Sequence, residues 1–290
     1  MTDQPWYLKN YKEMLKTKGR IVPAVQKVLL TEQNEKNQHR DTAHLHPSEL
    51  SKKEFCPRSA WYKIKGYEAS PESFSFSRMN VFEEGNNIHH KWQRWLHKAG
   101  ILWGIWICEE CHTLWSAKSP EKCIGCSSMR IRYREVPLRD DEHHIIGHAD
   151  GEIEDDQGRA LIEIKSVGIG TVRFENPSLF KAYADKTITI DDVWDNIKRP
   201  FASHLRQGNL YMHCRKVDRM VFIYEWKPTQ QVKEFEVKFQ PELIAEILDN
   251  CKTVMSHLEE DTVPERPTWA SNKSSNGCKY CPYKEACWNA

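Results

Sequence analysis

The spacing of the cysteines constrains the fold of this 290-residue chain more than any other feature of its sequence. Four of the ten cysteines form two C-x2-C pairs with eleven residues between them: Cys108, Cys111, Cys123 and Cys126. Each pair can bend into a knuckle that presents two thiolates to one ion, and two knuckles complete a tetrahedral zinc site. We therefore expect a zinc ribbon at residues 108–126, with a structural role because four cysteines leave no coordination position open. Free thiols and a redox pair are the alternatives.

A second set of cysteines near residue 290 is one ligand short of a metal site. It follows a C-x2-C-x5-C pattern: Cys278, Cys281 and Cys287. Cys214 and Cys251 lie in segments expected to be helical with apolar neighbours, which favours inert, buried thiols. Cys56 precedes a proline, where a tight turn can form. As the fourth ligand, Cys56 would close the fold like a clasp. Four thiolates suit either a second zinc or an iron–sulfur cluster, and spacing does not choose between them.

Charge and hydropathy narrow the class of protein. The net charge of +1, from 42 basic and 41 acidic side chains, excludes a uniformly basic nucleic-acid coat protein. Residues 1–65 nevertheless carry a net charge of +6 and residues 139–158 one of −7. A metal-dependent enzyme acting on a polyanion needs such an arrangement, although ordinary surface patchiness also produces it. The longest apolar run, residues 99–108, is about half a membrane span, and no signal-peptide pattern is present, so we expect a cytoplasmic protein without a membrane partner.

The order of the expected elements predicts a mixed fold. Helices are expected at residues 78–99, 198–215 and 241–258, and strands at 134–138, 144–153, 160–166, 220–227 and 232–239. This order favours an α/β or α+β core. Residues 1–45 form an N-terminal extension in this scheme, with a helix at 6–18 and a polar linker at 32–40.

The candidate catalytic residues gather at residues 144–166. Asp150 ends one expected strand, and the next strand contains Glu163-Ile164-Lys165. Residues two apart in a strand point to the same face, so Glu163 and Lys165 should lie side by side and close to Asp150. Carboxylates bind Mg²⁺ or Mn²⁺, which activate water and stabilise charge on a phosphoryl group, while a lysine can position the water. An exposed strand face with an ion pair is the alternative. Residues 168–171 are expected to form a mobile loop nearby.

Asp150 together with Glu163-Ile164-Lys165 resembles the D…(D/E)-x-K core of the PD-(D/E)XK nuclease superfamily. Other segments resemble its RecB-like branch: residues 85–89 resemble the helical G-x-x-x-H element, and residues 207–211 resemble the Q-x-x-x-Y helix. Cys56 with the C-x2-C-x5-C set resembles the split clasp of the CRISPR-associated and AddB-type iron–sulfur exonucleases. The motifs follow one another in the order that is typical of that branch.

The resemblance implies a restriction-endonuclease-like core, with a central mixed sheet flanked by helices, forming a nuclease domain over residues 46–290. The zinc ribbon at 108–126 would be an insertion in this domain. The ribbon and residues 1–45 are departures from the minimal pattern of the superfamily.

The resemblance also implies roles for individual residues. The Mg²⁺ or Mn²⁺ ligands would be His89, Asp150, Glu163 and the Ile164 carbonyl. Lys165 would orient the nucleophile. The residues contacting the DNA strand would be Gln207 and Tyr211. The ligands of a 4Fe-4S cluster would be Cys56, Cys278, Cys281 and Cys287.

The implied activity is hydrolysis of DNA phosphodiester bonds by an exonuclease that acts on single strands or DNA ends. Two alternatives stay open: a nicking or double-strand endonuclease on the same core, and a non-catalytic DNA-binding module. A zinc-only transcription factor would explain the ribbon but not the strand carboxylates. DNA repair, recombination, phage DNA processing and CRISPR spacer handling are compatible settings, in a bacterial or phage-infected cell. No G-x-x-x-x-G-K-[ST] motif occurs, so any unwinding requires a helicase or recombination partner.

Overall fold

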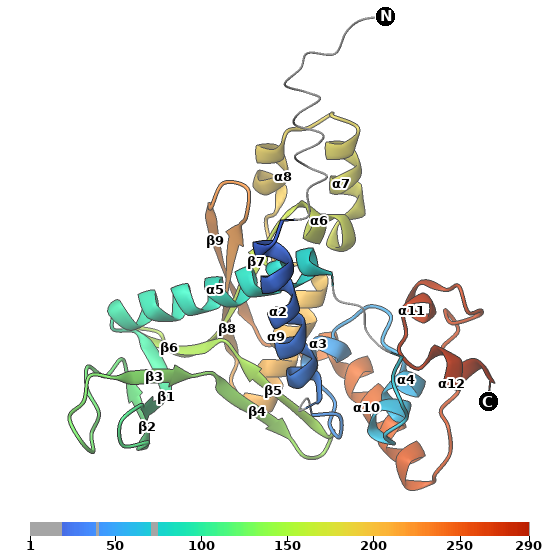
Figure 1. Cartoon of the computed structure of the whole chain (residues 1–290), viewed down its shortest axis with the longest axis horizontal. Coiled ribbons are helices and arrows are strands. Elements are labelled where there is room, and N and C mark those ends of the chain that lie inside the picture. The colour runs from blue at the N-terminus through green and yellow to red at the C-terminus, as the bar shows by residue number, and fades with distance from the viewer. Residues whose placement is uncertain (1–18, 39–40, 71–74, 290) are drawn as a thin grey trace, which may run out of the picture. The chain divides into compact units, whose positions relative to one another are not determined.

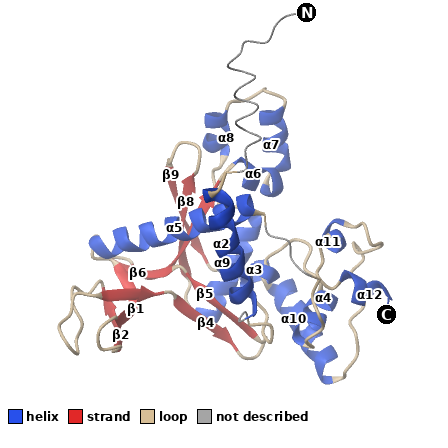
Figure 2. Ribbon diagram, in the orientation of Figure 1, coloured by secondary structure: helices blue, strands red, loops and turns tan. Residues whose placement is uncertain are grey.

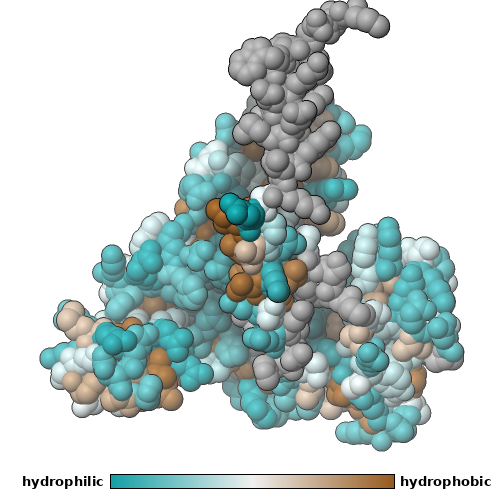
Figure 3. Space-filling view, viewed as in Figure 1, coloured by the Kyte–Doolittle hydropathy of each residue, from teal (hydrophilic) through white to brown (hydrophobic). Residues whose placement is uncertain are grey.

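The computed structural model describes residues 19–38, 41–70 and 75–289. The described chain divides into two compact units, one with residues 19–38, 41 and 75–83 and the other with residues 42–70 and 84–289. The first unit contains α2 (Ile21–Gln38), which continues through residues 32–38, where we expected a linker. Apolar side chains of α2 are exposed: Ile21, Val22, Val25 and Val28. Brown hydrophobic patches lie over the region of α2 in Figure 3. The helix expected at 6–18 lies outside the described residues.

A mixed sheet forms the centre of the second unit (Figures 1 and 2). The described residues give it seven strands in the order β2-β1-β6-β7-β8-β9, with β3 paired to β1. The strands are β1 (Leu102–Cys108), β2 (Leu114–Lys118), β3 (Ile131–Arg134), β6 (Gly151–Asp155), β7 (Gly158–Val167), β8 (Arg219–Trp226) and β9 (Val232–Lys238). β7 and β8 run parallel, with Glu163 opposite Phe222, and the other pairs are antiparallel. A second sheet contains β4 (Val136–Asp140) and β5 (Ile145–Ala149).

Helices flank the sheet on both faces. On one face, Ile88 of α5 (Phe76–Lys98) belongs to a core cluster with Ile162 and Ile164 of β7 and Val221 of β8. On the other face, α9 (Ala202–Arg215) and the β4–β5 sheet contribute to a cluster that contains Phe222. Alternation along β7 produces this division, because residues 162 and 164 point to one face and residues 161, 163 and 165 point to the other. The chain is therefore a mixed α/β protein with a central mixed sheet flanked by helices, as the sequence predicts.

Several element boundaries differ from the sequence-based expectation. The strand expected at 144–153 is two strands, β5 and β6, which belong to different sheets and meet at Asp150. The strand expected at 134–138 is likewise divided at Glu135. A mobile loop at 168–171 was a wrong prediction, because Gly168 is the N-cap of α6 (Ile169–Glu175). α6 opens a helical connection from β7 to β8 that continues through α7 (Pro177–Ala184) and α8 (Ile190–Asn196) to α9.

The remaining helices are α3 (Pro47–Leu50), α4 (Pro57–Ile64), a 3₁₀ turn at Pro241–Leu243, α10 (Ala245–Glu259), α11 (Asn276–Lys279) and α12 (Lys284–Asn289). Of these, α4, α10, α11 and α12 lie near one another, whereas α3 lies beside α9 (Figure 1). Trp61 and Tyr62 of α4 are 3% and 1% exposed and pack with Tyr283. Their role is therefore core packing. Of the helices that the structure describes, none is both long and apolar enough to cross a bilayer.

Candidate active site

Asp150 is fixed at the junction between the two sheets. It is the single residue between β5 and β6 and is 7% exposed. Its Oδ2 accepts a hydrogen bond from the Ile164 backbone N–H at 2.6 Å. Its carbonyl accepts one from Gln93 Nε2 of α5 at 2.8 Å. These bonds hold the carboxylate against β7, so the expected proximity of Asp150 to the Glu163-Ile164-Lys165 segment is present. Ile164 contacts Asp150 through its backbone N–H. Metal binding by the Ile164 carbonyl stays a prediction.

Glu163 and Lys165 lie together on the face of β7 that α9 covers. Lys165 Nζ lies 2.6 Å from Glu163 Oε1 and donates a hydrogen bond to Gln207 Oε1 at 2.9 Å. Gln207 Nε2 in turn donates to the Tyr211 hydroxyl at 2.7 Å. Gln207 and Tyr211 are one turn apart on α9, which explains why both reach the same strand face. The four side chains therefore form one continuous hydrogen-bonded chain.

A second group of ligating atoms approaches Asp150. His89 Nδ1 of α5 lies 3.1 Å from Asp150 Oδ1. One ligating atom each from His89, Glu135 and Asp150 lie within 4.8 Å of one another. Glu135 was not predicted from the sequence, and no local pattern marks it within a charged segment. The register that pairs Val136 with Ala149 brings it beside Asp150, because these are the residues next to Glu135 and Asp150.

The electrostatics of the site carboxylates favour a bound cation, although Glu163 does not belong to the 4.8 Å group of His89, Glu135 and Asp150. Glu163 is 3% exposed, and its Oε2 has no hydrogen-bond partner within the described part of the chain. Burial and the nearby Asp150 raise the pKa of Glu163, although Lys165 opposes them. Burial and Asp150 also raise the pKa of Glu135. Burial would lower the pKa of His89, but the hydrogen bond and charge of Asp150 outweigh it and raise the pKa. Clustered carboxylates repel one another, and a divalent cation would relieve that repulsion.

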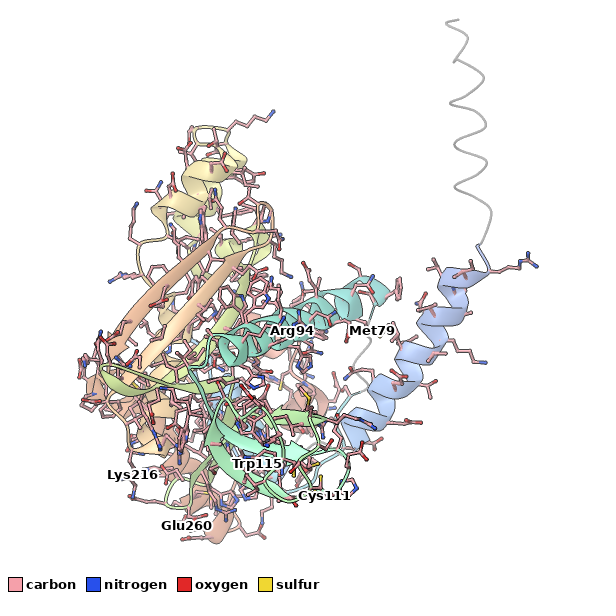
Figure 4. The ribbon with its side chains drawn as sticks, turned by 90° about the vertical axis from the view of Figure 1, so that its left-hand side faces the viewer. Met79, Arg94, Cys111, Trp115, Lys216 and Glu260 are labelled. Atoms are coloured by element: carbon pink, nitrogen blue, oxygen red, sulfur yellow. The ribbon has the colours of Figure 1, made fainter. Side chains whose placement is uncertain are left out.

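The cysteine tetrad of the predicted ribbon converges on one point. Cys108 Sγ lies 3.6 Å from Cys126 Sγ, and Cys111 Sγ lies 3.5 Å from Cys123 Sγ, with all four within 4.8 Å of one another. Four sulfurs at about 2.3 Å from one zinc ion would lie about 3.8 Å apart, so the tetrad fits this ion. Hydrogen bonds from Thr113 lower the pKa of Cys111 to about 6, whereas the neighbouring thiols of Cys111 and Cys108 raise the pKa of Cys126 to about 12. Cys111 lies near Trp115 of β2 (Figure 4).

The thiols of the other four predicted metal-binding cysteines are near enough to interact electrostatically, Cys56 and Cys278 each with Cys281 and Cys287. Burial, and less strongly the thiols of Cys281 and Cys287, raise the pKa of Cys56 to about 11. Cys278 lies in α11 and is electrostatically coupled to the same two thiols. Arg58 Nε donates to Cys287 Sγ at 3.2 Å, and Ser59 Oγ lies 3.4 Å from Cys281 Sγ.

This second set is more open than the ribbon tetrad. Among the described residues, the groups of three or more ligating atoms within 4.8 Å of one another include the ribbon cysteines but not this set.

Comparisons with known proteins give distant similarities. No family model matches this sequence, and no curated protein matches it. The chain is similar to an alkaline exonuclease (LHK-Exo) from Laribacter hongkongensis, with 13% sequence identity and a TM-score of 0.39, over 76% of this chain and 90% of that one. A structure of LHK-Exo in complex with dAMP gives 14% identity and a TM-score of 0.40 over the same shares. The structure of SSO0001 gives 14% identity and a TM-score of 0.42, over 93% of this chain and 96% of that one. At this distance, the function of the chain has to be argued from its own residues.

Proposed function

We propose that this chain is a metal-dependent DNA nuclease of the PD-(D/E)XK type, and that it acts as an exonuclease on single strands or DNA ends. The observation that carries the proposal is the convergence of Asp150, Glu163 and Lys165, with His89 and Glu135 at the same carboxylate. Glu163 Oε2 is a buried carboxylate oxygen with no hydrogen-bond partner among the described residues, and the charge of Asp150 lies nearby. Carboxylate oxygens are the donors that a hard divalent cation prefers.

The chain's own residues divide into cation-holding and positioning groups. Asp150, Glu163 and His89 would hold Mg²⁺ or Mn²⁺, with Glu135 as a further ligand. When bound, the cation would supply Lewis-acid stabilisation of the phosphoryl group and a lower pKa for water. Lys165 is held between Glu163 and Gln207, so its ammonium is fixed where it can orient the attacking oxygen or stabilise developing negative charge.

Tyr211 can act as a neutral donor to the DNA strand. Its hydroxyl oxygen accepts the hydrogen bond from Gln207, which leaves its own hydrogen available to a phosphate oxygen. Burial and the charges of Glu163 and Asp150 raise the pKa of Tyr211 far above neutrality. The hydroxyl therefore stays protonated at physiological pH.

The two cysteine sets would have structural roles in a nuclease domain over residues 46–290, with residues 1–45 as an extension. Zinc in the ribbon at 108–126 would stabilise an inserted arm that clamps DNA or binds a partner protein. A 4Fe-4S cluster on Cys56, Cys278, Cys281 and Cys287 would join α4 to the segment around α11 and α12. The hydrogen bonds that Arg58 and Ser59 make with two of these sulfurs support a metal–thiolate group at this position. A helicase or recombination partner would supply unwinding in repair, recombination or phage and CRISPR DNA processing.

The proposal is tested with anaerobically purified protein in Mg²⁺ or Mn²⁺. End-labelled linear single-stranded DNA and circular single-stranded DNA of the same sequence are incubated in parallel with wild type, Glu163→Ala and Lys165→Ala. Glu154→Gln provides a matched control, because it removes a carboxylate charge from the neighbouring strand β6 at a partly exposed position outside the site. We expect wild type and the control to degrade the linear substrate alone, and both site variants to lose at least a hundredfold in rate (about 10²–10³ for an electrostatic contact of this kind).

The alternatives predict different outcomes. Cutting of the circle, abolished in both site variants, would replace the exonuclease by an endonuclease. Binding of DNA by folded wild-type protein without cleavage that depends on these residues would favour a non-catalytic module and contradict the proposal.

A further inference from the structure

A second histidine–carboxylate cluster lies where the β4–β5 hairpin meets α9. Asp140 ends β4, His143 lies in the hairpin turn, and His213 lies in the last turn of α9. Asp140 Oδ2 is 2.7 Å from His143 Nδ1 and 3.0 Å from His213 Nε2. One ligating atom from each residue lies within 4.8 Å of the others. None of these residues contacts the candidate catalytic residues in the interactions described above.

The buried ring of His143 carries an unsatisfied nitrogen. Its side chain is 5% exposed, and Nε2 has no hydrogen-bond partner within the residues that the structure describes. If His143 Nδ1 donates its hydrogen to Asp140, a neutral ring leaves Nε2 as a buried acceptor without a donor, which is unfavourable. The group facing Nε2 is the Glu142 carboxylate, with Oε1 at 3.8 Å. This carboxylate can only accept, so it cannot satisfy a bare Nε2.

A metal ion at Nδ1 resolves this mismatch. A neutral histidine that binds a metal through one nitrogen carries its hydrogen on the other, and that hydrogen commonly points to a carboxylate. With the metal on Nδ1, His143 Nε2–H would point toward Glu142. The position also favours a cation because His213 lies at the C-terminal end of α9, where the helix dipole is negative.

We propose that Asp140, His143 and His213 form a third metal site, which binds a divalent transition metal such as Zn²⁺ and joins the β4–β5 hairpin to α9. Two imidazoles and one carboxylate are ligands that suit zinc, and three protein ligands leave one position for water or another ligand. His213 is 30% exposed at its side chain, which gives an ion a route into the site. The site would fix the position of α9, the helix that carries Gln207 and Tyr211.

The test compares zinc content among matched variants. Wild type, His213→Gln, Asp140→Asn and His148→Gln are purified anaerobically, given excess Zn²⁺ with saturating Mg²⁺, desalted, and analysed for zinc per chain by mass spectrometry. His148 is an exposed histidine on β5 of the same hairpin and serves as the control. We expect wild type and His148→Gln to hold one more zinc per chain than His213→Gln and Asp140→Asn. Zinc in the ribbon, the clasp or the candidate active site is common to all four proteins and cancels in the difference.

A second measurement uses wild type alone, with the cysteine sites already filled with zinc and the candidate active site saturated with Mg²⁺, so it does not depend on variants that fold. Added Co²⁺ at this nitrogen–oxygen site would give weak visible absorption bands without the intense thiolate charge-transfer band of a cysteine site. Equal zinc content in all four folded proteins would overturn the proposal and leave a purely hydrogen-bonded triad. Failure of folded wild type to retain Co²⁺ with this spectrum would overturn it as well.

Discussion

The contact between α9 and β8 can be tested at a single glycine. Gly208 lies between the two α9 residues of the candidate site, and a Cβ built at this position would lie 2.5 Å from Phe222 Cζ and 2.6 Å from Met220 Sδ. Both neighbours belong to the buried core, and each is 0% exposed. We therefore expect Gly208→Ala to destabilise the protein, because the ring has no free space into which it can move.

The expected magnitude is the difference between two opposing effects. Overpacking of a core costs about 1–3 kcal/mol, and a contact this short belongs to the upper half of that range. Replacing glycine by alanine inside a helix returns about 1 kcal/mol. The net loss in the free energy of unfolding should therefore be about 1–2 kcal/mol. Gly85 in α5 is the matched control, since a Cβ there meets nothing within 4 Å. Gly85→Ala should stabilise the protein by about 0.5–1 kcal/mol.

The assay is urea unfolding followed by tryptophan fluorescence and circular dichroism, with both variants measured beside wild type. Gly208→Ala should lower the free energy of unfolding less in a Phe222→Leu background than in wild type, because the shorter side chain at residue 222 relieves the contact. If Gly208→Ala stabilises the protein as much as Gly85→Ala does, α9 does not press against β8 as described and the reasoning is wrong.

Two further predictions concern buried ionisable groups. Glu225 is 1% exposed and accepts hydrogen bonds from Lys91 Nζ and from Trp92 Nε1. Lys91→Met should lower the free energy of unfolding in urea by about 3 kcal/mol, because it leaves the buried carboxylate unpaired, and adding Glu225→Gln should recover most of that loss. An equal loss in the double variant would refute the pairing. Burial and the charge of Lys165 hold the pKa of His204 well below 6.5 in the folded protein. At acidic pH the unfolded chain therefore binds a proton on this histidine that the folded protein does not bind. The free energy of unfolding should fall as the pH drops below about 6.5, by at most about 1.4 kcal/mol per pH unit. His204→Gln should flatten this dependence in urea unfolding between about pH 7 and pH 5, and an unchanged slope would show that other groups control it.

Local sequence patterns were sufficient to predict the central strand β7 and the side chains on its two faces. The alternation of Leu161 to Lys165 with apolar neighbours defines the two faces of β7, and the structure has Glu163 and Lys165 on the face that α9 covers. Cysteine spacing predicted the tetrad at 108–126 in the same way, since each knuckle is a local structure. These features depend on residues a few positions apart, for which sequence patterns are informative.

Features that depend on long-range pairing were not predictable from pattern. Glu135 reaches Asp150 only through the register of β4 with β5, and the change of sheet at Asp150 leaves no mark in a continuous strand-like segment. The approach of His213 to Asp140 requires α9 to pack on a hairpin that is distant in sequence. Residues 168–171 contain two glycines, which suggested a loop, whereas the structure uses Gly168 to begin α6.

The parallel pairing of β7 with β8 also determines when the candidate site is completed during folding. The β6–β7 hairpin closes through a short turn, but β8 can join β7 only after residues 168–218 have formed a return path across the sheet. Because α9 belongs to that path, Gln207 and Tyr211 should reach Lys165 in the same slow event that seats β8. A partly folded chain would therefore hold the acidic residues without their positioning partners. If the chain is the nuclease proposed above, this topology would keep such folding intermediates from cleaving DNA before the site is complete.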